Sequence, residues 1–196
     1  VPVLYYTNGY EIYVIDGLYP SRKVMASHTA EELEYMIQKR SRNDITDLVI
    51  RDDISGRPYQ KMAITNMCEW LNKKHRRGLL VMATGTGKTR TASSLTDVLS
   101  RGGYITNVLF LADRTALVKQ AKDDFKNYLP DMSLCNLCSS KDDKTARIVF
   151  STYPTMLHAI DECKTKDGLP LFTPTHFDLI IIDDKDKKRK LQIKSK

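Results

Sequence analysis

The pattern of apolar and polar residues divides the second part of the chain into short apolar runs and longer amphipathic segments. The apolar runs predict strands at residues 79–83, 107–112, 147–151 and 178–183. The segments between them carry apolar residues at helical spacing, which predicts helices over 88–100, 115–128 and 154–162. Nearly continuous apolar strands that alternate with amphipathic helices predict an α/β fold, a parallel sheet with helices on both faces.

The N-terminal residues have a different pattern. Residues 3–7 and 10–15 alternate around Asn8-Gly9, which predicts a β-hairpin with a two-residue type I′ turn. Thr29 and Glu32 form a capping-box pattern that opens a helix to about Arg40. The polar stretch that follows predicts a boundary, with residues 1–45 as a small N-terminal piece and residues 46–184 as the main domain. Pro58 then begins a helix to about Lys74.

The chemistry centres on Ala83-Thr84-Gly85-Thr86-Gly87-Lys88-Thr89, which lies between a predicted strand and a predicted helix. This context predicts a phosphate-binding loop, because glycines let backbone N–H groups turn toward a polyphosphate. Lys88 is expected to reach the β- and γ-phosphates and Thr89 to ligate Mg²⁺. Met82 occupies the position of the first glycine in the longer form of the motif. The alternative interpretation is a glycine-rich turn without a ligand.

A second segment, residues 177–184, ends an apolar strand in two carboxylates. At the carboxyl end of a strand, Asp183 is expected to hold the Mg²⁺ that Thr89 ligates, and Asp184 to orient the attacking water. The alternative is a solvated acidic turn. Upstream of the loop, Gln60 and Arg57 are expected near adenine, since an amide suits its Hoogsteen edge, and Tyr59 could pack on the base.

Composition adds two points. The net charge of +7 resides almost wholly in residues 185–196, which hold seven basic residues and one acidic residue. We expect this tail to be disordered, with a phosphate-binding arm as the alternative. The four cysteines favour buried free thiols in a reducing cytosol over a zinc site built from Cys135, Cys138, Cys163 and His158.

Two further features of the sequence concern its setting. The chain contains no run of 18 apolar residues, so we expect no membrane span. It begins at Val1 and carries no signal-peptide pattern, so we expect a piece of a longer protein, located in the cytoplasm.

Taken in order, these motifs resemble those of superfamily 2 helicases, and more narrowly the restriction (R) subunit of type I restriction–modification enzymes. The resemblance covers almost the whole chain up to Asp183. It rests on five segments, which are residues 57–60, 82–89, 110–114, 149–153 and 180–183. Residues 110–120 are similar to motif Ia of that family, and residues 6–13 look like the closing strands of its N-terminal endonuclease domain.

The resemblance implies a RecA-like lobe of an ATP-driven translocase that pulls double-stranded DNA toward a nuclease. It implies ATP and Mg²⁺ as cofactors, and modification and specificity subunits as partners. The nucleotide-binding residues would be Arg57, Gln60, Thr84, Gly85, Thr86, Gly87, Lys88 and Thr89, with Lys88, Asp183 and Asp184 catalytic. The residues that would face the DNA backbone are Arg114, Ser151 and Thr152. The alternatives are that Arg114 caps or forms a salt bridge with its own helix, and that Ser151 and Thr152 only end a strand.

Two departures from the family lower the expected activity. In the family, helicase motif II reads Asp-Glu-Ser/Ala-His, whereas the same positions in this chain read Asp183-Asp184-Lys185-Asp186. From Lys185 onward the sequence resembles nothing in the family, and the second lobe with its arginine finger is not expected here. We therefore expect weak nucleotide binding and negligible hydrolysis. Two alternatives stay open: another superfamily 2 motor, from type III restriction or DNA repair, and a non-enzymatic nucleic-acid-interaction fragment.

Overall fold

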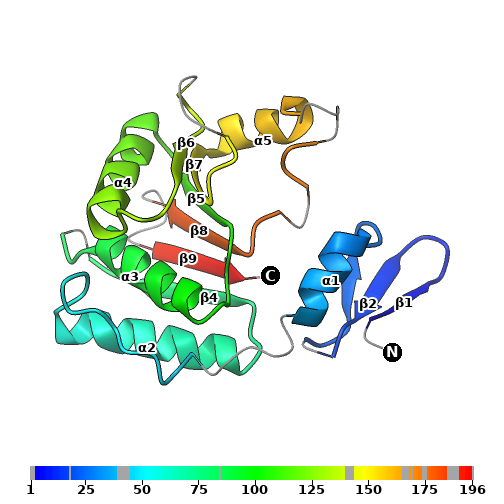
Figure 1. Cartoon of the computed structure of the whole chain (residues 1–196), viewed down its shortest axis with the longest axis horizontal. Helices are drawn as coiled ribbons and strands as arrows, with labels where there is room; N and C mark the ends of the chain where they lie inside the picture. Colours follow the sequence, from blue (N-terminus) through cyan, green and yellow to red (C-terminus); the bar gives the residue numbers. More distant parts are fainter. Residues whose placement is uncertain are drawn as a thin grey trace.

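The computed structural model describes residues 3–17, 19–38, 45–83, 85–139, 144–164, 168, 170–173, 176–184 and 190–195. Figure 1 shows two parts, a small N-terminal unit of strands and one helix, and a larger α/β unit. Among the described helices, none has the length and apolar composition needed to cross a bilayer.

The N-terminal unit is a three-stranded antiparallel sheet of order β1-β2-β3, followed by helix α1. Its elements are β1 (Leu4–Thr7), β2 (Ile12–Ile15), β3 (Arg22–Val24) and α1 (Ala30–Gln38). The predicted capping box is confirmed: the Thr29 N–H donates to Glu32 Oε2 at 2.8 Å, and the Glu32 N–H donates to Thr29 Oγ1 at 3.3 Å.

The predicted hairpin is present, but the prediction of a two-residue turn is wrong. Thr7 pairs with Ile12, so the loop has four residues, 8–11. The Asn8 side chain accepts hydrogen bonds from the N–H groups of Tyr10 at 3.0 Å and Glu11 at 2.8 Å. Gly9 alone of the loop residues has a positive φ, +90°, whereas a type I′ turn needs two such residues. The side-chain bonds of Asn8 therefore stabilise a longer loop than the dipeptide predicts.

The larger unit is built on a six-stranded sheet of order β4-β9-β8-β5-β7-β6. Its strands are β4 (Arg77–Val81), β5 (Val108–Ala112), β6 (Leu134–Asn136), β7 (Ile148–Thr152), β8 (Leu179–Asp184) and β9 (Lys190–Ser195). Its helices are α2 (Pro58–Asn72), α3 (Lys88–Arg101), α4 (Thr115–Tyr128) and α5 (Tyr153–Glu162). The predicted α/β fold is confirmed, and the structure adds a short strand, β6, that was not predicted from the sequence.

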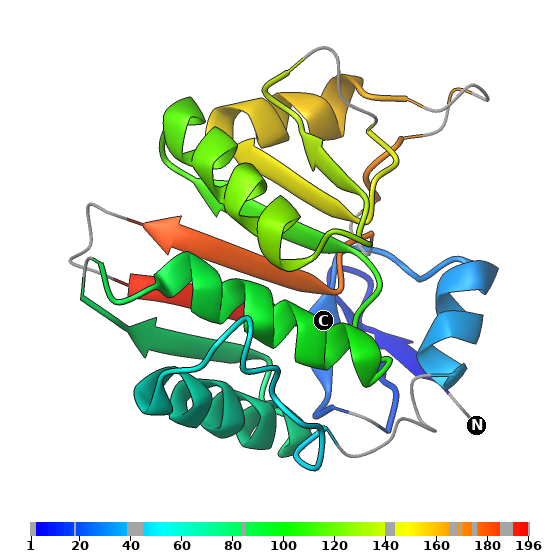
Figure 2. The ribbon, with the colours of Figure 1, turned by 60° about the vertical axis from the view of Figure 1, so that its left-hand side comes forward.

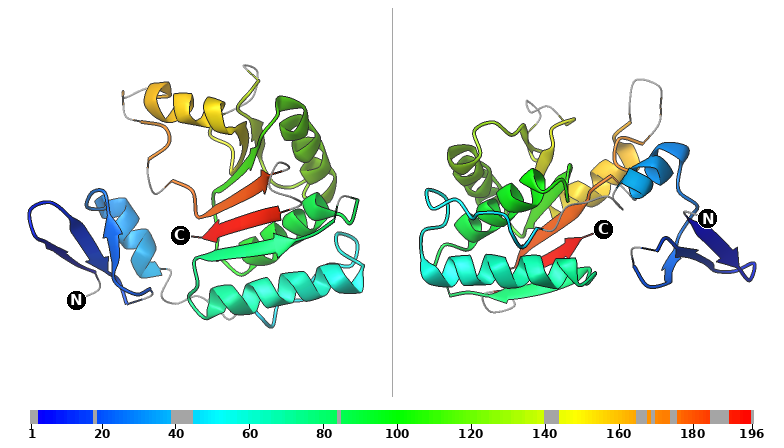
Figure 3. Two further views of the ribbon diagram at one scale, coloured as in Figure 1. Left: turned by 180° about the vertical axis from the view of Figure 1, so that it is seen from behind. Right: turned by 60° about the horizontal axis from the view of Figure 1, so that its bottom comes forward.

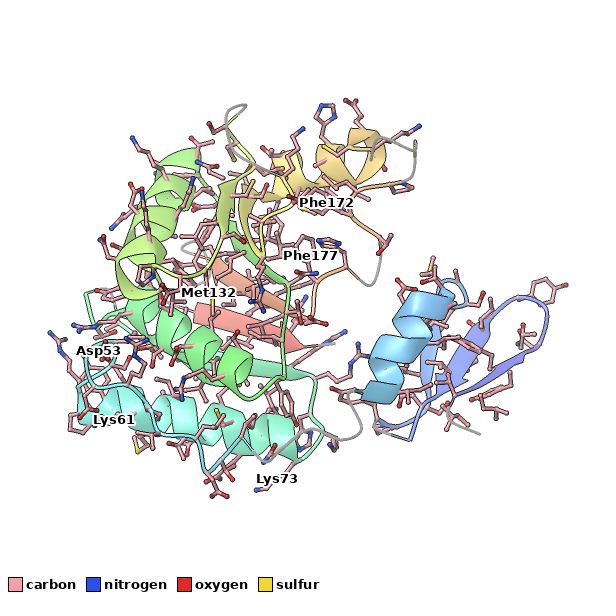
Figure 4. The ribbon with its side chains drawn as sticks, viewed as in Figure 1. Asp53, Lys61, Lys73, Met132, Phe172 and Phe177 are labelled. Carbon is pink, nitrogen blue, oxygen red and sulfur yellow. The ribbon has the colours of Figure 1, made fainter. Side chains whose placement is uncertain are left out.

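Alternate residues of the strands feed two hydrophobic clusters on opposite faces of the sheet. One face packs against α2, α3 and α4, with Phe110, Phe125 and Phe150 in mutual ring contact at its centre. The other face packs against α5 and the segment that carries Phe172 and Phe177. Figure 2 shows α3 and α4 on the first face, and Figure 4 labels Phe172 and Phe177 beside the second.

Strand β9 overturns the expectation that the basic tail is disordered, at least for residues 190–195. It lies between β4 and β8 and pairs antiparallel with both (Figure 3). Only five residues join β8 to β9, too few for the crossover that a parallel strand needs. Ile193 is 1% exposed within the main core, and Ile45 packs there too. The core of the larger unit thus extends beyond the predicted limits 46–184.

The two units meet at an arginine–tyrosine contact. The Arg76 guanidinium, just before β4, lies 5.5 Å from the centre of the Tyr19 ring in the N-terminal unit. Arg22 lies 5.3 Å from the same ring and forms an ion pair with buried Asp16 at 2.6 Å. Burial and the neighbouring Arg22 charge lower the pKa of Arg76. The contact links the small sheet to the strand that leads into the phosphate loop.

Candidate nucleotide-binding site

The phosphate loop has the backbone geometry that its glycines predict. Gly85 and Gly87 adopt positive φ angles of +81° and +85°, where a side chain would be strained. Helix α3 begins at Lys88, directly after Gly87, and the Thr91 N–H donates to the Gly87 carbonyl at 2.9 Å. The loop therefore brings glycine N–H groups, Lys88 and a helix N-terminus to one point, an arrangement suited to a polyphosphate.

Side chains from the first turn of α2 donate hydrogen bonds to the backbone of this loop. Gln60, 1% exposed, donates through Nε2 to the Thr86 carbonyl at 2.9 Å, and the Tyr59 hydroxyl donates to the same oxygen at 3.0 Å. Arg57 Nη1 in turn donates to the Tyr59 hydroxyl at 2.8 Å. That hydrogen bond raises the pKa of Arg57. Tyr59 and Gln60 thus contact the phosphate loop directly, and Arg57 contacts it through the Tyr59 hydroxyl.

A cavity of about 350 Å³ lies in front of the loop. It brings together most of the residues that the sequence assigned to nucleotide and metal binding: Arg57, Gln60, Gly85, Gly87, Lys88, Thr89 and Asp183. Thr84 and the side chain of Asp184 lie outside the described part of the structure, and Thr86 contributes its carbonyl to the contacts with α2. The chemical role of each of these residues stays a prediction.

Sheet order explains how Asp183 reaches this cavity. Asp183 pairs with Leu191 of β9 and with Ala112 of β5, at the carboxyl ends of β8 and β5. Because β9 separates β8 from β4, the strand before the phosphate loop lies two strand spacings away, about 9.5 Å. Hydroxyl and carboxylate oxygens are ligands that Mg²⁺ accepts, so Thr89 and Asp183 fit the predicted ion.

One face of α4 forms another wall of the cavity, and this wall was not predicted from the sequence. Leu117, Gln120, Ala121, Asp124 and Tyr128 line it. Their spacing along the helix is the only signal that could have grouped them. Burial, with the nearby Asp123 charge, raises the pKa of Asp124. The α4 wall therefore combines apolar side chains with a carboxyl group whose pKa is raised.

Arg90, from the first turn of α3, also lines the cavity and lies beside Tyr128 of α4. Its guanidinium donates to the carbonyls of Ile54 and, at 2.8 Å, of Asp53, and it lies 5.3 Å from the centre of the Tyr128 ring. Figure 4 shows Asp53 on the segment that leads into α2. Arg90 thus connects three elements, the segment before α2, α3 and α4, around the candidate site.

The residues predicted to contact DNA fall into two groups. The Arg114 side chain is 74% exposed and forms an ion pair with Asp113 at 3.5 Å, so its contact with DNA stays a prediction. Ser151 and Thr152 are 0% and 6% exposed. Ser151 donates to the Thr152 carbonyl at 3.0 Å, and Thr152 accepts from the Thr155 N–H as the cap of α5. Both hydroxyls are thus used in hydrogen bonds within the chain, and the expected contact of these two residues with DNA stays a prediction.

The described cysteines do not gather. All four are free thiols, with Cys68 and Cys135 buried. No group of three or more metal-binding side chains of the His, Cys, Asp or Glu type occurs in the described part of the chain.

A phosphate loop at the carboxyl end of a parallel-rich sheet, facing a carboxylate two strands away, defines an α/β domain of the phosphate-loop NTPase class. The comparison with protein families gives the narrower assignment. Residues 53–186 match the ResIII family, described as the type III restriction enzyme, res subunit. The match covers most of the chain, and the chain belongs to this family.

Individual relatives agree with this assignment. The chain is 35% identical over 137 residues to the endonuclease subunit of the type I restriction enzyme EcoAI of Escherichia coli, covering 68% of this chain and 16% of the relative. It is 31% identical over 143 residues to the EcoKI endonuclease subunit of E. coli strain K12, covering 65% and 12%. The chain thus spans less than a fifth of the length of these relatives.

A solved structure supports the fold. It is a fragment described as an HsdR subunit of a type I restriction enzyme from Vibrio vulnificus YJ016. The TM-score is 0.52 at 24% identity, and the match covers 93% of this chain and 33% of the other. The resemblance to restriction-enzyme R subunits is therefore confirmed at the level of family and fold.

Proposed function

We propose that the larger unit binds Mg²⁺–ATP in the cavity between the phosphate loop and Asp183. The observation that carries the proposal is the convergence in one cavity of Gly87, Lys88 and Thr89 with Asp183 from a strand about 95 residues further along the chain. Gly85 supports it, because an added Cβ there would meet nothing within 4 Å, so the loop leaves open space above it.

The residues would divide the work as follows. The N–H groups of the loop and the Lys88 ammonium hold the polyphosphate, and the Thr89 hydroxyl and Asp183 carboxylate hold the metal ion. When bound, Mg²⁺ neutralises charge on the phosphate oxygens. Asp184, the next residue after Asp183, would orient a water molecule for attack, with a carboxylate one methylene shorter than the glutamate of the resembled motif.

Within the longer protein, we propose that this lobe belongs to an ATP-dependent DNA translocase of a restriction system. Support comes from the family, from relatives named as type I endonuclease subunits, and from exposed Arg114. Residues 1–45 would be the edge of an endonuclease domain, and the partners would be double-stranded DNA with modification and specificity subunits. A type III restriction motor is the second candidate, since the family description carries that name.

Nucleotide binding to the chain is the direct test. Titration calorimetry with ADP in Mg²⁺ should detect binding, and Lys88→Ala should weaken it by roughly 10- to 150-fold, the value of one hydrogen bond to a charged group. Lys126→Ala, on the exposed end of α4, is the matched control. Equal binding by the wild-type chain and Lys88→Ala would refute the site.

Hydrolysis by this chain should be negligible, because such motors complete the site with an arginine from elsewhere and here Asp184 replaces the glutamate. Phosphate release measured with and without double-stranded DNA tests this. A DNA-stimulated turnover near 1 s⁻¹, about the lower end of the range for phosphoryl-transfer enzymes, would contradict it.

A further inference from the structure

One backbone carbonyl of the phosphate loop is held by two side chains from the same helical turn. The Thr86 carbonyl accepts from Tyr59 Oη at 3.0 Å and from Gln60 Nε2 at 2.9 Å. The other polar groups of Thr86 turn to Ala83: its N–H and its hydroxyl both donate to the Ala83 carbonyl, at 3.3 and 2.6 Å. Thr86 is thus held on two sides, by α2 and by its own loop.

Peptide geometry carries this anchor to the next residue. A trans peptide is planar, and its C=O and N–H point in opposite directions. Because the Thr86 carbonyl points toward Tyr59 and Gln60, the N–H of Gly87 points away from α2. Gly87 lines the cavity in front of the loop. An added Cβ on Gly87 would lie 2.5 Å from Gln60 Nε2, so glycine is also what lets α2 approach so closely.

Arg57 determines which way the Tyr59 hydroxyl donates. A phenol has a single proton, and it can accept a hydrogen bond while it donates that proton elsewhere. Arg57 Nη1 can only donate, and it does so to Tyr59 Oη at 2.8 Å. The phenol proton is therefore left for the Thr86 carbonyl, and the three groups form a directed chain from guanidinium to phosphate loop.

We propose that Tyr59 is a positioning residue of the nucleotide site, whose hydroxyl, oriented by Arg57, holds the Thr86 carbonyl so that the Gly87 N–H faces the polyphosphate. The proposal rests on the nucleotide binding proposed above. It gives Tyr59 a role at the phosphates, whereas the sequence suggested packing on the base. The ring of Tyr59 then matters only as the support of its hydroxyl.

A base-free ligand distinguishes the two roles. We would measure binding of ADP and of inorganic tripolyphosphate, both with Mg²⁺, to the wild-type chain, Tyr59→Phe and Tyr59→Ala. Loss of one neutral hydrogen bond predicts that Tyr59→Phe weakens both ligands by the same factor, roughly three- to tenfold. Tyr59→Ala should likewise affect both ligands equally. Tyr10→Phe, in the N-terminal unit with Tyr10 96% exposed, is the matched control and should bind like the wild type.

These measurements distinguish a positioning role of Tyr59 from a contact with the base and from a merely structural role. Unchanged affinity in Tyr59→Phe, or a loss confined to ADP, would overturn the positioning role. Equal losses for both ligands with an unchanged melting temperature would support it, because a merely structural role would lower the melting temperature as well. A wild-type chain that binds neither ligand would instead refute the proposed nucleotide site.

Discussion

A hydrogen bond between Asp178 and Thr106 links β5 to β8, the strand that carries Asp183 into the candidate site. The Asp178 carboxylate, 4% exposed, accepts the Thr106 N–H at 2.8 Å and the Asn107 N–H at 3.2 Å. These bonds lie just before β8 and β5, at the ends opposite the cavity. They align the two strands in the register that sets Asp183 beside Ala112.

Removing this carboxylate should therefore destabilise the larger unit. Asp178→Ala leaves the N–H groups of Thr106 and Asn107 without their charged acceptor, and we expect a loss of about 1–3 kcal/mol in the free energy of unfolding. Urea denaturation followed by circular dichroism measures it. Asp161→Ala, on the exposed face of α5, is the control. A change in Asp178→Ala no larger than in the control would show that the two N–H groups find other partners.

Strand β9 offers a second prediction, because the sequence suggested disorder there. Ile193 is buried on the face covered by α2 and α3, so Ile193→Ala should cost about 2–5 kcal/mol of unfolding free energy. Lys194→Ala, the next residue and on the opposite face, should change it by less than about 0.5 kcal/mol. Equal and small effects in a denaturant titration would mean that the strand does not pack in solution.

Cys68 gives a prediction about pH. Burial raises the pKa of its thiol from 9.0 to about 12. The unfolded chain loses this proton first as pH rises, so the folded state binds more protons above pH 9 and its stability falls from there toward pH 12. At pH 10 this group should remove about 1.4 kcal/mol of stability relative to pH 8.

Comparison with Cys68→Ala isolates this contribution from the lysines and tyrosines that also titrate above pH 9. The variant should have a lower free energy of unfolding at pH 8 but a shallower decline up to pH 10. Parallel curves for the two proteins would indicate that the Cys68 thiol ionises as easily in the folded state as in the unfolded chain.

Arg114 should contribute to DNA binding without reading sequence. We expect Arg114→Ala to weaken binding of double-stranded DNA about equally for unrelated sequences, and to reduce the slope of log K against log salt by about 1. Fluorescence anisotropy over a salt series measures both quantities. Lys126→Ala serves as the control. An unchanged slope in Arg114→Ala would assign the DNA contact to other residues.

The sequence predicted the parts of the fold that depend on neighbouring residues. The phosphate loop between a strand and a helix, the capping box at Thr29 and the apolar strands are all local signals, and the structure confirms those elements. Strand β9 was missed because the charge of the tail outweighed a short alternation, in which Leu191 and Ile193 are separated by a polar residue.

Features that depend on distant parts of the chain were harder to predict. The hydrogen bonds of Tyr59 and Gln60 to Thr86 arise from how α2 packs beside the loop, and the α4 wall from how that helix crosses the sheet. The burial of Ser151 could not be predicted either. A hydroxyl at a strand end fits a DNA contact by sequence, but β7 lies between β5 and β6 and the Ser151 side chain is buried.

The central claim is that Asp183 and the phosphate loop act on one metal–nucleotide complex. Its most direct test is the Mg²⁺ dependence of ADP binding, measured by calorimetry for the wild-type chain and Asp183→Asn. We predict that Mg²⁺ tightens binding to the wild type by at least about tenfold, and that Asp183→Asn keeps the metal-free affinity but loses this gain. The same Mg²⁺ gain in both proteins would contradict it.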